Sequence, residues 1–346
     1  MNQTVKLSCD TAEADLDRVF ACFQAAFAQA PHDATYILSQ TAFEVRAQCH
    51  TYLRLTDRAL ASRGTHRGTP SRIAVGVAGV KGFPVLKWTD PYFEERRVEA
   101  VLAKTRYRMH YFLDRGFWQV FDRETGRGMQ IMASDDGYPD WDPGSPLRNF
   151  VQWRLVQNGG ALIHAGTLAS GEDGVLLVGA GGSGKSGTVL AGVLHGLGSV
   201  GDDYVFVNTK TMAASALFDT LKQDTDGLVR LGLSDHGAIP RQTNWQDKHQ
   251  FYLPDLAPDA CRETIRLKAL FLPAISNAAQ TTMTPATAKE GFLALAPSGV
   301  SQIPGDRPVL YATAAEVARR LPCYHLHLGT DPAEISNVIR TFIDEN

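Results

Sequence analysis

Residues 179–203 read GAGGSGKSGTVLAGVLHGLGSVGDD, in which a glycine-rich loop is followed by a short apolar run and then by two adjacent aspartates. The first part, Gly179 to Ser186, matches the phosphate-loop pattern G-x-x-x-x-G-K-[ST]. Glycines allow backbone N–H groups to turn toward phosphate oxygens without Cβ clashes, and the N-terminus of a following helix adds a favourable dipole. The apolar VLLV before the loop predicts a buried strand, and SGTVLAGVLHGL after it predicts a helix. The stretch therefore predicts a strand, an anion-binding loop and a helix in an α/β domain.

The loop pattern also predicts particular contacts with a nucleotide. We expect Lys185 to reach the β- and γ-phosphates and the Ser186 hydroxyl to bind Mg²⁺. The nucleotide-binding residues expected from the pattern are Gly179, Ala180, Gly181, Gly182, Ser183, Gly184, Lys185, Ser186 and Gly187. The alternative is a glycine-rich turn that binds nothing, which the flanking strand and helix patterns disfavour.

Asp202 and Asp203 precede an apolar strand, Tyr204 to Val207, whereas the metal-site aspartate of an ordinary phosphate-loop hydrolase ends such a strand. The pair follows Lys185 by 17 and 18 residues, which is enough for one helix and a turn back toward the γ-phosphate. Two carboxylates there suit two tasks, because one can hold Mg²⁺ while the other accepts the proton of an incoming hydroxyl. This arrangement favours a kinase over a hydrolase. The alternative is an Asp-Asp turn on the surface.

The remaining patterns divide the chain into two α/β parts. Residues 1–140 predict a smaller N-terminal domain, with a helix over residues 12–30 and strands at RIAVGVAG and WQVFDRE. It has no catalytic constellation, and a substrate-recognition role and a scaffold role stay open. The Asp-, Gly- and Pro-rich stretch SDDGYPDWDPGSP predicts a linker, and residues 141–346 predict the larger domain.

Capping patterns place three helices in the larger domain. Ser145 before a proline predicts a helix start, and Thr313 with Glu316 predicts a capping box. Asp331 predicts the cap of the last helix. The segments ALIHAG, LFDTLKQD, HQFYL, LKALFLPAI and CYHLHLG predict strands.

The composition is that of an ordinary globular protein, with 44% hydrophobic residues, 21% charged residues and a formal net charge of -3. Eight basic residues between positions 94 and 127 interleave with six acidic ones, which predicts a solvated mixed face and no nucleic-acid partner. Five scattered cysteines without a Cys-x-x-Cys pair indicate a reducing compartment. The N-terminus lacks the apolar core of a signal peptide, and no apolar run approaches the roughly 20 residues of a membrane span. We therefore expect a cytoplasmic protein with no membrane partner, for which a homo-oligomer is an open possibility.

His164, the segment GEDGVLLVGAGGSGKSG and the segment GLGSVGDD resemble the catalytic core of the HPr kinase/phosphorylase family and its related serine kinases. The family pattern is a histidine after a short strand, a strand leading into the phosphate loop, and an Asp-Asp pair after the loop helix. The segments DDYVFVN, ALFDTLK, DKHQFYL and PCYHLHLG are similar to related kinases often found beside biosynthetic gene clusters. The resemblance covers about residues 145–346 and implies the fold shared with ATP-dependent phosphoenolpyruvate carboxykinases.

The resemblance implies ATP and Mg²⁺ as cofactors and a role for each matching residue. It implies nucleotide-phosphate binding by the loop and Mg²⁺ binding by Ser186 and Asp202. It implies that Asp203 is the base, with the order of the two aspartates open, and that Lys185 is catalytic. It also implies a supporting role near the acceptor for His164, whose alternative is an ordinary histidine at a strand end.

Two departures from the family pattern limit what the resemblance implies. Gly187 follows the loop serine where the family has an acidic residue, and the segment LVRLGLSDHG offers no counterpart of a later metal-binding glutamate. Both disfavour HPr as substrate and disfavour the phosphate-removing reaction. The sequence therefore predicts an ATP- and Mg²⁺-dependent kinase that acts on a serine or similar hydroxyl of a peptide, protein or small molecule. The alternatives are a nucleotide-binding regulatory module without phosphotransfer and a carboxykinase-like or hydrolytic enzyme.

Four further side chains have two readings each. Lys222 and Lys248 lie in the segments similar to the related kinases and are candidates for neutralising phosphate charge, unless they are ordinary surface lysines. His325 and His327 alternate along a predicted strand and form a possible metal pair, but no carboxylate or thiol partner is evident in the sequence, which favours a structural reading.

Overall fold

The computed structural model describes residues 3–91 and 94–346, and the chain divides into two compact units. Unit 1 contains Met1–Asp57, Thr65–Gln157 and Ile303–Arg307. Unit 2 contains Arg58–Gly64, Asn158–Gln302 and Pro308–Asn346. The division differs from the boundary predicted at residue 140, because residues 141–157 fold with the N-terminal part. In addition, residues 58–64 belong to unit 2 and residues 303–307 belong to unit 1.

Unit 1 is built on a mixed sheet in which the β3–β4 and β4–β8 pairs are parallel and the other pairs are antiparallel. In sheet order its strands are β2 (His32–Leu38), β3 (Thr41–Ala47), β4 (Ser71–Val77), β8 (Arg127–Met132), β7 (Phe117–Asp122) and β6 (Tyr107–Phe112). A separate parallel pair joins β1 (Thr4–Leu7) to β5 (Val85–Trp88).

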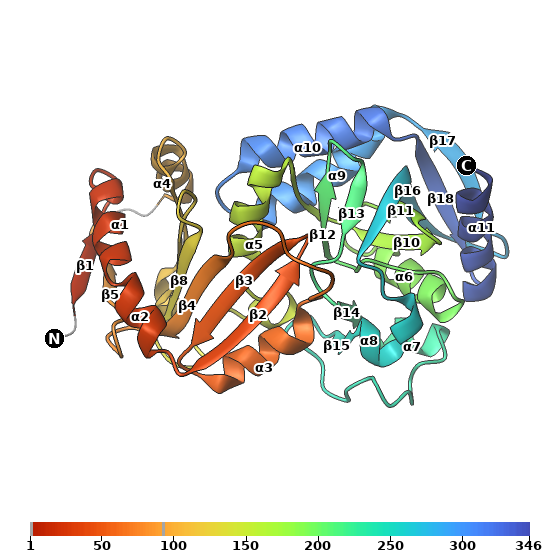
Figure 1. Cartoon of the computed structure of the whole chain (residues 1–346). Helices are drawn as coiled ribbons and strands as arrows, with labels where there is room; N and C mark the ends of the chain where they lie inside the picture. Colours follow the sequence, from red (N-terminus) through yellow and green to blue (C-terminus); the bar gives the residue numbers. More distant parts are fainter. Residues whose placement is uncertain (1–2, 92–93) are drawn as a thin grey trace. The chain divides into compact units, whose positions relative to one another are not determined.

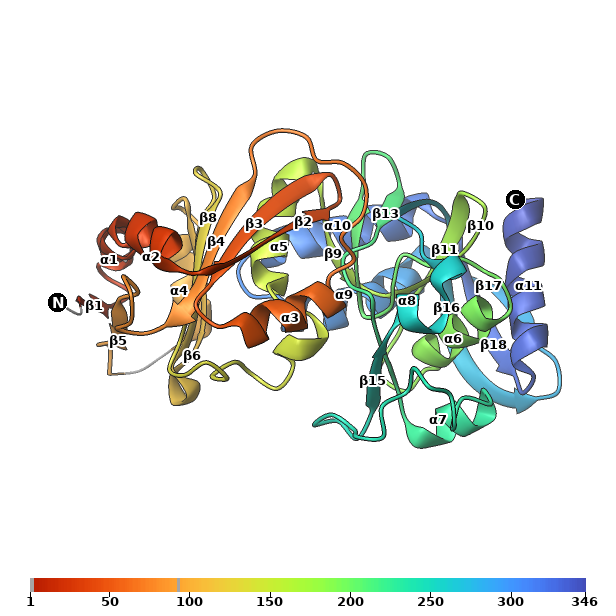
Figure 2. The same cartoon turned by 60° about the horizontal axis from the view of Figure 1, so that its bottom comes forward.

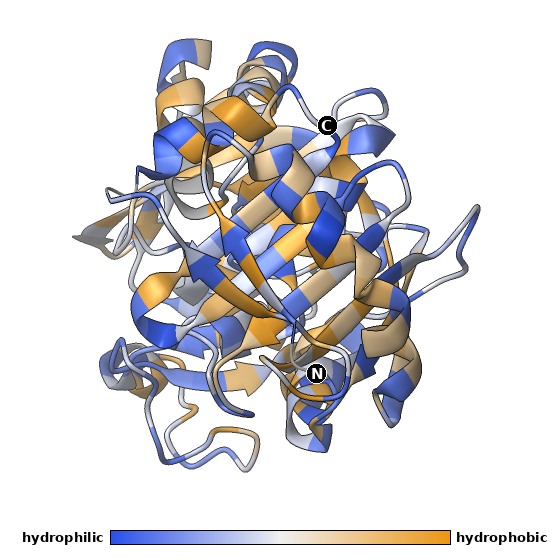
Figure 3. Ribbon diagram, turned by 90° about the vertical axis from the view of Figure 1, so that its left-hand side faces the viewer, coloured by the Kyte–Doolittle hydropathy of each residue, from blue (hydrophilic) through white to orange (hydrophobic). Residues whose placement is uncertain are grey.

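The helices of unit 1 supply apolar side chains to a core shared with these strands. They are α1 (Ala12–Ala21), α2 (Phe23–Gln29), α3 (His50–Ala59, which ends in unit 2), α4 (Glu95–Leu102) and α5 (Arg148–Leu155). Leu16 and Phe23 from the helices and Val120 and Met129 from the sheet are fully buried in this core. Hydrophobic residues accordingly run along the helices and strands of the ribbon in Figure 3.

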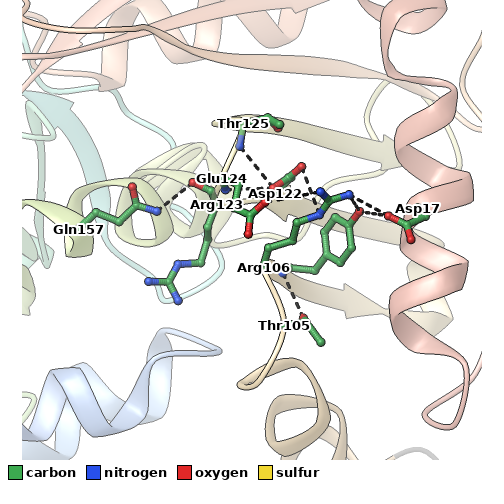
Figure 4. A network of polar contacts seen from close by, with 9 residues as sticks. Asp17, Thr105, Arg106, Asp122, Arg123, Glu124, Thr125 and Gln157 are labelled. Carbon is green, nitrogen blue, oxygen red and sulfur yellow. Dashed lines mark hydrogen bonds and ion pairs between the residues drawn. The ribbon is translucent and has the colours of Figure 1, made fainter.

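In the mixed-charge segment between residues 94 and 127, Arg106 forms ion pairs with other residues of unit 1. Arg106, which directly precedes β6, contacts Asp17 of α1 at 2.8 Å and lies 3.7 Å from Asp122 and 3.6 Å from Glu124 (Figure 4). The Tyr107 hydroxyl donates a hydrogen bond to Asp17. These contacts tie α1 to the β6–β7 edge of the sheet.

Unit 2 contains a larger mixed sheet whose long strand β16 lies at its centre (Figure 1). In sheet order its strands are β10 (Gly166–Ser170), β11 (Asp173–Leu177), β16 (Thr264–Ala278), β13 (Ala213–Ser215), β12 (Tyr204–Asn208) and β9 (Gly160–His164), and β18 (Cys323–Gly329) joins β16 to β17 (Thr282–Ala286). A separate antiparallel pair joins β14 (Thr220–Gln223) to β15 (His249–Tyr252).

Helices cover both faces of this sheet. They are α6 (Lys185–Leu194), α7 (Thr225–Arg230), α8 (Leu253–Leu256), α9 (Ala288–Gln302), α10 (Arg307–Arg320, whose first residue is in unit 1) and α11 (Pro332–Glu345). Val175 and Leu177 of β11 pack in a core with α6 and α11, whereas Leu176 between them packs in the core with α9 and α10. A strand buried on both faces explains why VLLV is apolar without alternation.

Several sequence-based expectations on local structure are wrong. The helix expected over residues 12–30 is interrupted at Cys22, between α1 and α2. The expected linker is not a free connection, because Asp142 and Ser145 are buried within unit 1. Ser145 does not cap α5, which begins at Arg148. Thr313 does not start a helix, because it is buried in the interior of α10.

Candidate active site

The glycine-rich loop connects the end of β11 to the start of α6, with the predicted strand and helix present on either side of it. Gly179, Gly182 and Gly184 have positive φ angles of 149°, 81° and 103°. At Gly184 a Cβ atom would also lie 2.5 Å from Leu328 Cδ1 of the neighbouring strand β18. The backbone conformation therefore favours glycine at this position, whereas the Leu328 side chain could shift to make room for a Cβ atom.

Lys185 is the first residue of α6, and its side chain folds back over the loop. Its Nζ atom donates hydrogen bonds to the C=O groups of Gly179, at 2.8 Å, and Ala180, at 3.0 Å. Burial lowers the pKa of Lys185, while the charges of Asp202 and Asp203 oppose this shift. Among the described residues its hydrogen-bond acceptors are these two carbonyl groups, and a buried ammonium bonded to neutral groups favours an anionic ligand nearby.

Asp202 lies in the turn before β12 and is almost fully buried, with 2% of its surface exposed. Burial, and then the charge of Asp203, raises the pKa of Asp202, whereas a hydrogen bond with the Ser186 hydroxyl lowers it. Its Oδ1 atom has no hydrogen-bond partner among the described residues. Gly166 of β10 makes room for this carboxylate, since a Cβ atom there would lie 3.0 Å from Asp202 Oδ1 and 2.6 Å from Val189 Cγ2.

A network of buried hydroxyl groups holds the turn that carries the two aspartates. The Thr167 hydroxyl donates to the C=O of Gly201 at 2.9 Å and accepts from the N–H of Val200 at 3.0 Å. The Ser199 hydroxyl lies 2.9 Å from that of Thr167 and accepts from the N–H of Gly201. These residues were not predictable from the sequence, because their role depends on the pairing of distant segments.

Asp203 adopts a left-handed backbone conformation, with a φ angle of 71°, which aspartate tolerates better than most residues. The Lys222 Nζ atom, from β14, donates to its Oδ2 atom at 2.7 Å, and the His164 Nε2 atom lies 3.5 Å from its Oδ1 atom. Burial alone would raise the pKa of Asp203, but the charge of Lys222 and the hydrogen bond from His164 outweigh burial and lower it strongly. Asp203 is therefore an ionised carboxylate held from two sides, with 26% of its side chain exposed.

His164 ends β9 and is paired in register with Tyr204, the first residue of β12. Its ring centroid lies 5.4 Å from that of Tyr204, and the N–H of the next residue, Ala165, donates to the C=O of Asp203 at 3.0 Å. The β9–β12 pairing thus brings His164 to Asp203. The structure also joins Lys222 to this group.

The β14–β15 pair lies beside α6 (Figures 1 and 2) and brings Lys222 and Lys248 into the area of the loop. Lys248, which directly precedes β15, is close enough for its charge to lower the pKa of Lys185. Gln223 lies against Gly187, where an added Cβ would be 3.4 Å from its Nε2 atom. The Gln223 side chain therefore lies within van der Waals reach of the start of α6.

The His325 and His327 pair has a different setting. Their rings lie 6.1 Å apart on β18, and His325 Nε2 lies 3.1 Å from Glu290 Oε1 of α9. This carboxylate was not evident from the sequence, because it is distant from the two histidines along the chain. Within residues 3–91 and 94–346, no group of three or more His, Cys, Asp or Glu side chains is arranged to hold a metal ion.

The residues around the loop nevertheless fit a magnesium-bound nucleotide. The unpartnered Oδ1 atom of Asp202 and the hydroxyl of Ser186 are oxygen donors of the type Mg²⁺ prefers, and the glycine loop leaves its backbone open to phosphate. Magnesium usually takes only one or two carboxylates and completes its shell with phosphate and water oxygens. A site without a three-residue cluster is therefore compatible with this ion.

No family profile and no curated relative matches the sequence of the chain. Among solved structures, the chain is similar to the HPr(Ser) kinase/phosphatase from Coxiella burnetii, with 14% sequence identity and a TM-score of 0.29. The alignment covers 53% of this chain and 97% of that chain. Values this low say nothing about activity. In the part of the chain that the structure describes, no helix is both long enough and apolar enough to cross a membrane.

Proposed function

We propose that this chain is an ATP- and Mg²⁺-dependent kinase that transfers the γ-phosphoryl group to a serine or similar hydroxyl of a peptide, protein or small molecule. One observation carries the proposal: Asp202 and Asp203 are adjacent in sequence but have opposite surroundings. Asp202 is buried against the loop serine Ser186, whereas Asp203 is partly open and is held by Lys222 and His164. Two carboxylates with separate environments at one phosphate loop suit the separate tasks of a kinase.

In this proposal the loop residues Gly179 to Gly187 bind the nucleotide phosphates through their backbone N–H groups. Lys185 exchanges its loop carbonyls for phosphate oxygens, which is a small movement because both acceptors belong to the same loop. Ser186 and Asp202 would hold Mg²⁺, which supplies positive charge to offset that of the phosphates when bound.

Asp203 receives the acceptor hydroxyl. It is ionised at neutral pH and has exposed surface, so it can accept a hydrogen bond from the hydroxyl and orient its oxygen toward phosphorus. A carboxylate with a lowered pKa is a weak base, and we therefore assign it a late proton transfer, as the new O–P bond forms. That timing suits the loose transition state of phosphoryl transfer. His164 fixes the direction of the carboxylate from the side opposite Lys222.

The test is phosphoryl transfer from γ-labelled ATP, with purified protein, candidate peptides and a metabolite extract as acceptors. We expect Lys185→Ala and Asp203→Asn to lose transfer, the second by about 10²- to 10⁴-fold while nucleotide binding is retained. Asp173→Asn is the matched control, because Asp173 also pairs with a lysine, Lys268, and has a similar exposure of 24%. It should leave transfer unchanged.

Three outcomes would contradict the kinase proposal. Nucleotide binding without any labelled acceptor or free phosphate would favour a regulatory module. Release of free phosphate alone, at a rate that Asp203→Asn does not change, would favour a hydrolase. Full transfer in the presence of a chelator would rule out the metal-binding role given to Ser186 and Asp202.

A further inference from the structure

Lys222 is a side chain of the site to which the loop pattern assigns no function. It lies on β14, outside the loop and its helix, and its ammonium contacts Asp203 Oδ2 at 2.7 Å. Only 16% of the Lys222 side chain is exposed. A lysine this enclosed is unusual, since lysines are mostly solvated.

The hydrogen-bonding capacity of Lys222 exceeds what its surroundings use. An ammonium group has three N–H donors, and among the described residues the acceptor found for Lys222 is Asp203. A largely enclosed ammonium needs further acceptors to offset its lost hydration. Its remaining donors can therefore serve a ligand that enters beside Asp203.

The charges around the loop also favour an anion at this point. Lys185 is influenced by two carboxylates, Asp202 and Asp203, and by a second ammonium, Lys248, while the Lys222 ammonium contacts Asp203. The cluster has an excess of positive charge until an anionic group binds.

The position of β14 is fixed relative to the loop helix. Lys222 pairs in register with Gln250 of β15, and the neighbouring Gln223 lies against Gly187 of α6. Asp224 then caps α7 by accepting a hydrogen bond from the N–H of Gly227 at 2.7 Å. Contacts on both sides of Lys222 thus hold its backbone in place beside α6.

We propose that β14 is a second phosphate-binding element, in which the Lys222 ammonium, held by Asp203, contacts the terminal phosphoryl group of a bound nucleoside triphosphate. The proposal rests on nucleotide binding by the loop. It also predicts which nucleotide the site prefers. Because Lys222 contacts Asp203, the carboxylate that receives the acceptor, Lys222 contacts the transferred phosphoryl group. A nucleoside diphosphate lacks this group. Lys222 therefore makes the site favour the triphosphate over the diphosphate.

The test compares the dissociation constants of Mg²⁺-bound ADP and of the non-hydrolysable β,γ-imido analogue of ATP, by titration calorimetry. We expect Lys222→Met to weaken binding of the triphosphate analogue by about ten- to a hundredfold, the usual effect of losing a hydrogen bond to a charged group, and to leave ADP binding unchanged. Lys222→Arg should regain part of the preference, because it keeps the charge. Asp203→Asn should keep the preference for the triphosphate, because the asparagine side-chain oxygen can still accept the hydrogen bond that holds the ammonium.

Lys268→Met is the matched control, since Lys268 also pairs with an aspartate in unit 2 and is 27% exposed. It should affect neither ligand. Equal weakening of both ligands by Lys222→Met, or an unchanged triphosphate preference, would overturn the proposal. If that variant melts below the assay temperature, Lys222→Gln decides in its place by the same ratio. Failure of the wild type to bind either ligand would instead contradict the proposed function as a whole, so the two failures are distinguishable.

Discussion

The pKa of Asp202 is raised and the pKa of Asp203 is lowered, although the two residues are neighbours in the chain. The difference comes from their surroundings, because the Asp203 carboxylate contacts Lys222 and His164 whereas Asp202 is buried beside Gly166. A sequence indicates that two acidic residues are present, but it does not indicate which one meets a lysine.

At Asp202 we predict opposite effects on stability and on metal use. Asp202→Asn removes a buried carboxylate whose ionisation is unfavourable, so the free energy of unfolding should stay equal or rise. The Mg²⁺ concentration that gives half-maximal nucleotide binding should rise by about tenfold or more. Urea denaturation and magnesium titration with a fluorescent nucleotide measure the two effects. An unchanged magnesium requirement would contradict the metal-binding role.

Gly166 gives a steric prediction beside the same carboxylate. Gly166→Ala places a Cβ atom 2.6 Å from Val189 Cγ2 and 3.0 Å from Asp202 Oδ1, so we expect a loss of about 1–3 kcal/mol in the free energy of unfolding. Gly237→Ala is the control, because nothing lies within 4 Å of a Cβ at that position. Chemical denaturation of both variants tests this, and equal stability would show that β10 moves away at little cost.

Among the elements, those that depend on local pattern were predictable. The strand before the loop, the helix after it and the cap at Asp331 all follow from neighbouring residues, and the structure contains each of them. The capping box at Thr313 was misread because Ser and Thr also occur inside helices, where tertiary packing overrides the signal. The position of Lys222 was not predictable in the same way, because it depends on how β14 packs against α6.

The cap of α11 gives a prediction for an element. The Asp331 side chain accepts a hydrogen bond from the N–H of Ala333 at 2.9 Å, and α11 buries Ile335, Ile339 and Phe342 against the sheet. Asp331→Ala should therefore cost about 1 kcal/mol in the free energy of unfolding. Asp344→Ala, in the last turn of the same helix, should not destabilise. Guanidinium denaturation of the full chain compares the two variants, and equal unfolding midpoints would contradict the capping role of Asp331.

At the scale of the whole molecule, the α/β class and the presence of two parts were predictable from the sequence, but the path of the chain between the parts was not. Residues 58–64 belong to unit 2 and residues 303–307 to unit 1, so the division is discontinuous. Arg108 of β6 contacts Asp306 at 2.9 Å, and Trp153 Nε1 donates to the C=O of Pro304. Such contacts join segments about 150 to 200 residues apart, beyond the reach of periodicity and capping patterns. The substrate-recognition or scaffold role of the N-terminal part stays a prediction.

Unit 1 contains a buried acid that makes its stability depend on pH. Asp142 is fully buried and accepts a hydrogen bond from the Tyr52 hydroxyl at 2.9 Å. Burial raises its pKa from 3.8 to about 7, against the opposing effects of Tyr52 and of the charge of Arg148. Between pH 4 and pH 7 the unfolded chain therefore loses this proton before the folded one does. The free energy of unfolding falls as pH rises through this window, by at most roughly 1.4 kcal/mol per pH unit.

Asp142→Asn should flatten this pH dependence and stabilise unit 1 near pH 7.5. Tryptophan fluorescence during urea denaturation reports on unit 1, which contains Trp88, Trp118, Trp141 and Trp153, whereas Trp245 lies in unit 2. Asp140→Asn, at an exposed residue paired with Arg115, is the control and should keep the wild-type slope. An Asp142→Asn variant with the wild-type slope would show that other groups control the pH dependence.

The central claim is that the loop, the two aspartates and Lys222 form one phosphoryl-transfer site. A crystal structure with Mg²⁺ and the β,γ-imido analogue of ATP tests it most directly. The account predicts the triphosphate on the loop, the metal ion at Ser186 and Asp202, and the terminal phosphoryl group beside Lys222 and Asp203. A nucleotide bound away from the loop, or a terminal phosphoryl group out of contact with both Lys222 and Asp203, would contradict it.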